Sequence, residues 1–151
     1  MTDDEIAAAA RQKGIDSFMA TFGRVPENFR LMERHAPGAF AGYALMRDFV
    51  MRGPAAGGAL DLKTKELIFA LLDTVVGQTN GAKNHAAAAV KAGLTLPELA
   101  EGLVQTVMVG GITCWNLTGA EVLRHCETLG ETVVDERKTP GGEAPPGGAA
   151  G

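Results

Sequence analysis

The sequence predicts an all-α fold, a compact bundle of about six to seven helices. Three observations support this prediction. Two segments, Thr2–Glu5 and Thr95–Glu98, have the Thr-x-x-Glu pattern of a capping box. Apolar residues recur at helical spacing, and few stretches alternate with the period of two that a half-buried strand requires. We therefore expect no sheet.

Caps, prolines and glycines predict where the helices begin and end. The first helix is expected to run from the Thr2 cap to about Lys13, where Gly14 interrupts it before a further segment to Phe22. Later helices are expected at about 26–35, 37–50, 61–76, 81–92 and 96–108, and from the Gly110-Gly111 break to about 129. Residues 1–137 should form one domain, followed by a disordered Gly/Pro-rich tail at 138–151.

Charge and hydrophobicity indicate which kinds of binding partner and which cellular location to expect. The 151 residues carry a net charge of −4 and contain no block of Lys or Arg, which argues against nucleic acid or an anionic membrane. The acidic N-terminus lacks the features of a signal peptide. The longest uninterrupted apolar stretch, Leu67–Leu72, is far shorter than the ~20 residues that span a bilayer. A cytoplasmic protein is expected.

The two cysteines, Cys114 and Cys126, do not form a close-spaced motif. On one continuous helix they would lie about 18 Å apart along the axis, beyond the reach of a disulfide. The sequence also lacks the paired His or Glu/His spacing of a helical metal site. We expect neither a disulfide nor a metal.

Glu66 and His85 are the best candidates for a functional pair. Glu66 stands at the edge of the apolar run, where a buried carboxylate needs a partner or a proton. His85 is expected about one turn into its helix, where the helix start suits an anionic ligand, and Asn80 and Asn84 could add hydrogen bonds. The structural alternatives are a solvated acidic stripe and a histidine bonded to a neighbouring carbonyl or to water.

Several segments resemble the carboxymuconolactone decarboxylase family, which includes the alkyl-hydroperoxidase-D-like proteins. The resemblance is closest over about 61–129, and FGRVP at 22–26 is similar to segments that precede this domain. The matching segments, in this order, are LKTKELI at 62–68, HAAAAVKAGLT at 85–95 and ELAEGL at 98–103.

The resemblance implies an all-α subunit that assembles into trimers or hexamers, with active sites near the subunit interfaces. In the peroxidase branch, a Glu is followed by a Cys-x-x-Cys and a His. Glu66 and His85 match in identity and spacing, but the cysteine positions fall on Gln78 and Gly81. Dithiol peroxide reduction requires an attacking thiolate and a resolving thiol, and neither residue supplies one.

The leading hypothesis is therefore a cofactor-free enzyme that decarboxylates a small carboxylated lactone or related acid. Glu66 and His85 would be catalytic, and Gln78, Asn80, Asn84 and Trp115 would bind the substrate. Lys63 and Lys83 are weaker candidates for holding its carboxylate, since both are expected in solvent. The alternatives are a thiol-dependent peroxidase, which the missing cysteines disfavour, and a non-catalytic oligomeric binding or scaffold protein.

Overall fold

The computed structural model describes residues 1–137, and every regular element in that range is helical, as predicted. The elements are α1 (Asp3–Phe22), α2 (Glu27–His35), α3 (Pro37–Val50), the short 3₁₀ turn η1 (Pro54–Ala56), α4 (Leu62–Val75), α5 (Thr79–Lys91), α6 (Leu96–Gly110), α7 (Ile112–Cys114), the π-helical turn η2 (Trp115–Gly119) and α8 (Ala120–Arg137).

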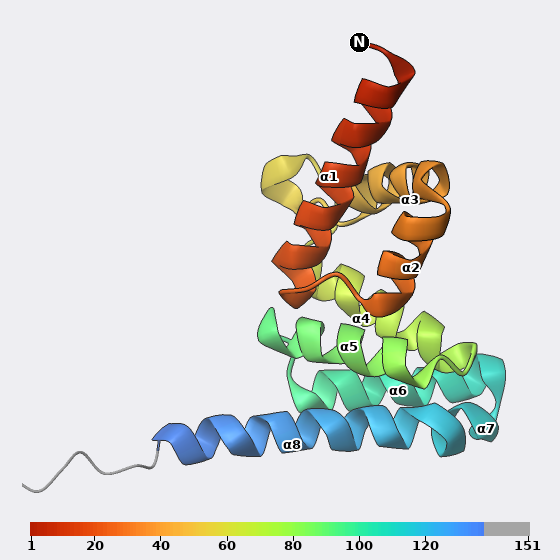
Figure 1. The fold of residues 1–151 in the computed structure, drawn as a ribbon. Coiled ribbons are helices and arrows are strands. Elements are labelled where there is room, and N and C mark those ends of the chain that lie inside the picture. The colour runs from red at the N-terminus through yellow and green to blue at the C-terminus, as the bar shows by residue number, and fades with distance from the viewer. Residues whose placement is uncertain (138–151) are drawn as a thin grey trace, which may run out of the picture.

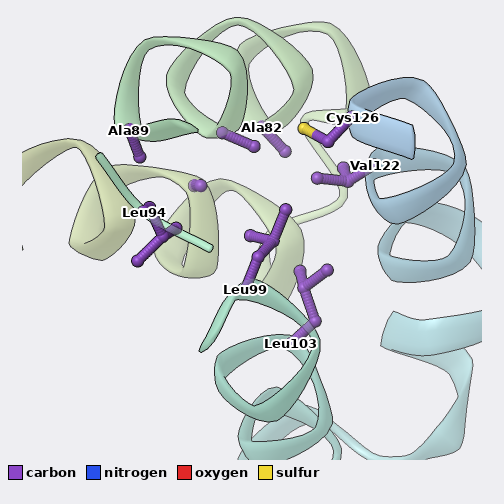
Figure 2. Close-up of a cluster of buried hydrophobic side chains, with 9 residues drawn as sticks. Ala82, Ala89, Leu94, Leu99, Leu103, Val122 and Cys126 are labelled. Atoms are coloured by element: carbon purple, nitrogen blue, oxygen red, sulfur yellow. The ribbon is translucent and has the colours of Figure 1, made fainter. Parts of the chain in front are cut away.

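The helices form two groups that meet at α4 and α5 (Figure 1). The N-terminal group of α1, α2 and α3 closes around the buried side chains of Phe18, Val25, Phe40 and Ala44. The second group packs α4, α5, α6 and α8 around a separate cluster (Figure 2). That cluster consists of Ala70, Ala82, Ala86, Ala89, Leu94, Leu99, Leu103, Val122 and Cys126. Helices α4 and α5 therefore lie between two hydrophobic cores.

The predicted helix caps are confirmed. Both capping boxes form, with the backbone N–H of Glu5 donating to Thr2 and that of Glu98 donating to Thr95. Asp61 caps α4 by accepting from the Thr64 backbone N–H over 2.7 Å, and this bond lowers the pKa of the Asp61 carboxyl. These local hydrogen bonds satisfy N–H groups that no helical carbonyl can reach.

The predicted interruption at Gly14 is wrong, because α1 continues unbroken through it. Gly14 is buried where α1 crosses α3, and a Cβ at this position would collide with the Cβ and Cα of Ala44. The glycine thus permits a close crossing of two helices rather than ending one.

Helix α5 begins at Thr79, two residues before the predicted start at Gly81, which makes His85 its seventh residue. The expectation that His85 lies near the helix start is therefore wrong. Since the influence of a helix dipole fades within the first turn, the site owes little to it.

The break at Gly110-Gly111 is confirmed, and Gly111 adopts a positive φ of 79° there. The last helix extends to Arg137, beyond the predicted end at 129. The predicted tail at 138–151 lies outside the described residues. Within residues 1–137, no helix is long and apolar enough to cross a membrane.

The crossing of α1 and α3 can be tested with Gly14→Ala. We expect this variant to lose about 1–3 kcal/mol of unfolding free energy in urea, because the added methyl overpacks the contact with Ala44. Gly42→Ala on α3 is the control, since its Cβ would meet nothing within 4 Å. That variant should be unchanged or up to about 1 kcal/mol more stable. Equal stability of the two variants would contradict the close crossing.

Candidate active site

The structure brings Glu66 of α4 and His85 of α5 into direct contact. Glu66 Oε2 and His85 Nδ1 are hydrogen-bonded at 2.6 Å, and the Glu66 residue is only 3% exposed. When Glu66 is ionised, Nδ1–H donates this bond and leaves Nε2 able to accept a proton. The two residues thus form a carboxylate–imidazole pair of the type used for proton transfer.

Two aromatic rings fix the orientation of the imidazole. Phe69, one turn along α4 from Glu66, stacks on His85 with ring centroids 4.8 Å apart and an interplanar angle of 23°. Phe22, the last residue of α1, approaches edge-on at 5.7 Å. Because one ring stacks on the imidazole and the other meets it edge-on, the His85 ring is held in a partly apolar environment, with its side chain 19% exposed.

A cavity of about 280 Å³ borders the pair on the Glu66 side, between α1, α4 and α5. Its size is near the lower limit of the roughly 300–1,000 Å³ typical of small-molecule pockets. The cavity has room for a small compound. Its lining residues are Ser17, Ala20, Thr21, Met51, Leu62, Glu66, Ala88, Lys91 and Ala92.

Arg47 of α3 is a residue beside this site that sequence reasoning missed. It is 7% exposed, and its Nη1 donates to Ser17 Oγ over 2.6 Å. Burial lowers the pKa of the guanidinium, while Tyr43 and Glu66 oppose that shift. The available signal was its position on the apolar face of α3, one turn after Tyr43 and seven residues after Phe40.

Asp73 lies against the position where the peroxidase branch has its second cysteine. A Cβ at Gly81 would collide with Asp73 Oδ2, so the carboxylate occupies the space that a cysteine side chain at this position would need. Burial raises the pKa of Asp73, and the nearby His85 opposes this. A cysteine cannot simply be restored at Gly81 without displacing Asp73.

The remaining predicted substrate-binding residues are not among the residues that line the cavity beside Glu66. Gln78 precedes α5 and makes no capping bond, and Gln78, Asn80 and Asn84 are exposed. Trp115 is half-buried and packs against the second core. Their binding roles remain predictions.

The two weaker candidates for holding a carboxylate are also placed away from the pair. Lys83 forms an ion pair with Glu121, which engages its ammonium group. Lys63 lines a separate hollow beside Gly53 and Asp61.

Both cysteines are free and buried. Burial raises the pKa of Cys126 to about 11, and the thiol of Cys114 contacts the backbone oxygen of Val75 at 3.9 Å. A thiol with such a pKa supplies little thiolate at neutral pH, so Cys126 is a poor nucleophile. Among the side chains that the structure describes, which end at residue 130, no group of three His, Cys, Asp or Glu residues is placed to hold a metal ion.

The fold and the site define an all-helical protein with a buried Glu–His pair held between two packed helices and no dithiol beside it. The sequence model of the carboxymuconolactone decarboxylase family matches residues 37–125, more than half of the chain, so the chain belongs to this family. The match begins at α3, earlier than the core predicted from residue 61.

The fold is also similar to a crystal structure of a protein from Burkholderia xenovorans LB400 that is named a "putative carboxymuconolactone decarboxylase". The two chains share 28% sequence identity with a TM-score of 0.79, over 87% of this chain and 99% of the other. No curated protein matches the sequence. The similarity extends over most of the chain.

The environment of Asp73 predicts a pH-dependent effect on stability. Because its native pKa is raised, its ionised form costs stability at neutral pH, and the cost disappears as pH falls below the ordinary value of 3.8. We expect Asp73→Asn to raise the thermal midpoint at pH 7 and to have little effect at pH 3.

Asp61→Ala is the control, since the pKa of Asp61 is lowered. It should reduce the midpoint at pH 7, and this loss should shrink in acid. A lower midpoint for Asp73→Asn at pH 7 would contradict the burial of that carboxylate.

Proposed function

We propose that this protein is a cofactor-free decarboxylase of a small carboxylated lactone or a related acid. The observation that carries the proposal is the partly buried hydrogen bond between Glu66 and His85 beside a small, mainly apolar cavity. Membership in the carboxymuconolactone decarboxylase family supports the same chemistry.

The reaction requires one bond to break and one proton to be delivered. The bond between carbon and the departing carboxylate breaks, CO2 leaves, and the electron pair passes into the conjugated lactone carbonyl as an enolate. A proton then adds to carbon, so the net change is loss of CO2 and gain of H⁺. A positioned acid near neutral pKa accelerates such a step by about 10²–10⁴-fold.

In this proposal His85 delivers the proton and Glu66 supports it. The imidazole can hold a proton on Nε2 while Nδ1 remains hydrogen-bonded to Glu66. The Glu66 carboxylate stabilises the imidazolium before transfer and fixes the ring orientation throughout. Phe22 and Phe69 keep water from the ring faces, which favours return of the proton to carbon rather than exchange with solvent.

We also propose that the chain self-associates into a trimer or hexamer. Helices α4 and α6, which pack against each other, and the segment after α6 expose large apolar side chains. These residues are Leu72, Val76, Val104, Met108, Val109, Ile112 and Leu117. An apolar surface on this scale is typical of an interface between protein chains.

The decarboxylase proposal is tested by CO2 release from 4-carboxymuconolactone and from a panel of small β-keto acids. We expect His85→Ala and Glu66→Gln to lower kcat by about 10²–10⁴-fold, because each removes part of the proton-transfer pair. His35→Ala is the matched control, since His35 is an exposed residue at the end of α2 and should retain full activity.

Folding of each variant is checked by circular dichroism. Equal turnover in His85→Ala and the parent would end the proposal. So would thiol-dependent reduction of cumene hydroperoxide that disappears in Cys114→Ser, because that result would assign the protein to the peroxidase branch.

Self-association is tested by light scattering after size exclusion. Met108 is 86% exposed, and Met108→Lys should reduce the mass toward that of one chain, since a charge would enter an apolar interface. Leu31→Lys, at a 50% exposed position on α2, should leave the assembly intact. A parent protein that elutes as a monomer, or a Met108→Lys variant that stays assembled, would contradict the proposal.

A further inference from the structure

Arg47 is a buried cation without an anionic partner. It is 7% exposed, and no carboxylate oxygen of the described residues lies within 4.0 Å of its guanidinium nitrogens. Its one side-chain hydrogen bond goes to a neutral group, Ser17 Oγ, at 2.6 Å. A guanidinium has five N–H donors, so most of them are not used by side chains. No fully buried side-chain nitrogen of the described residues lacks a hydrogen-bond partner, so the other nitrogens of Arg47 retain some contact with solvent.

The rest of the guanidinium environment is aromatic. The guanidinium carbon lies 4.3 Å from the centroid of Phe18 and 5.5 Å from that of Phe22. Cation–π contacts compensate only partly for the loss of water around a buried charge. A guanidinium in such a setting favours a carboxylate ligand, because the planar fork can donate two parallel hydrogen bonds to it.

The groups around Arg47 connect it to the cavity and to the proton-transfer pair. Ser17, which accepts its hydrogen bond, lines the cavity together with Glu66. Glu66 acts electrostatically on Arg47, but its Oε2 is hydrogen-bonded to His85. Arg47 does not itself line the cavity, so its hydrogen bond to Ser17 is its link to that space. An anion held beside Ser17 would lie at the end of the cavity formed by α1, with Glu66 on another wall.

We propose that Arg47 binds a carboxylate of the substrate and thereby orients it toward Glu66 and His85. This inference rests on the proposed function for its reaction, although the binding step can be measured without turnover. A strong ion pair to the departing carboxylate would stabilise the ground state and slow its loss. Arg47 therefore holds a carboxylate that the product retains, and the ligand is a small compound with at least two acidic or carbonyl groups.

The test uses maleate, a small unsaturated dicarboxylate, as the probe in isothermal titration calorimetry. Arg47→Met keeps an unbranched apolar side chain against Phe18 and removes the charge. We expect it to raise the Kd for maleate by about 10- to 100-fold. Arg52→Met is the matched control, because Arg52 is exposed, pairs with Asp48 at 2.9 Å, and its loss makes the same change in net charge. It should bind like the parent.

A second measurement keeps the inference testable if Arg47→Met does not fold. In the wild-type protein, the side-chain Nε–H NMR signal of Arg47 should shift as maleate is added, and that of Arg52 should not. A wild type that does not bind maleate, an unmoved Arg47 signal, or equal Kd values in Arg47→Met and Arg52→Met would overturn the assignment.

Activity separates this inference from the proposed function. With an active lactone substrate, Arg47→Met should raise KM more than it lowers kcat, whereas His85→Ala should mainly lower kcat. Maleate binding that depends on Arg47 in a protein without CO2 release would leave the inference standing and refute the decarboxylase. Decarboxylation with an unchanged KM in Arg47→Met would support the decarboxylase and refute the role of Arg47.

Discussion

A carboxylate buried to the extent of Glu66 is stable only with a partner, and His85 is that partner in this fold. Their hydrogen bond joins α4 to α5, the two helices between the hydrophobic cores. Two aromatic side chains pack against the imidazole that this bond holds. Phe69 stacks on the imidazole from α4, and Phe22 closes over it from α1. The N-terminal helices thus contribute to the site as well as to stability, in line with a family match that begins at α3.

The absence of the dithiol is matched by a carboxylate close to one of the two cysteine positions. Where the peroxidase branch has a second cysteine, this chain has Gly81, and the Asp73 carboxylate lies against the space that a Cβ would need. The replacement of a thiol by glycine is therefore accompanied by a carboxylate that His85 influences electrostatically. The site therefore contains two carboxylates and an imidazole, Asp73, Glu66 and His85, where the peroxidase branch also has two sulfur atoms. In the non-catalytic alternative these charges would serve stability alone. Buried charged pairs often contribute little net stability, because removing them from water costs free energy.

Sequence patterns predicted the features that depend on local chemistry. The caps at Thr2, Asp61 and Thr95 and the break at Gly111 follow from neighbouring residues, and all are confirmed. The coupling of Glu66 with His85 required the family resemblance, because their separation in sequence says nothing about the crossing of α4 and α5. Arg47 was missed because its burial depends on how α1 packs on α3. The role of Gly14 depends on the same crossing, and no local pattern distinguishes it from a helix break.

The alanines of α5 have a consequence for how this chain can vary. Ala82, Ala86 and Ala89 are fully buried in the second core (Figure 2), while His85 lies on the same helix and contacts the aromatic side chains of α1 and α4. Methyl groups therefore set the spacing between the distal core and the imidazole. A larger side chain at any of the three positions would overpack this core and strain the position of α5, which carries His85. Residues that take no part in the chemistry thus help to determine the geometry of the site.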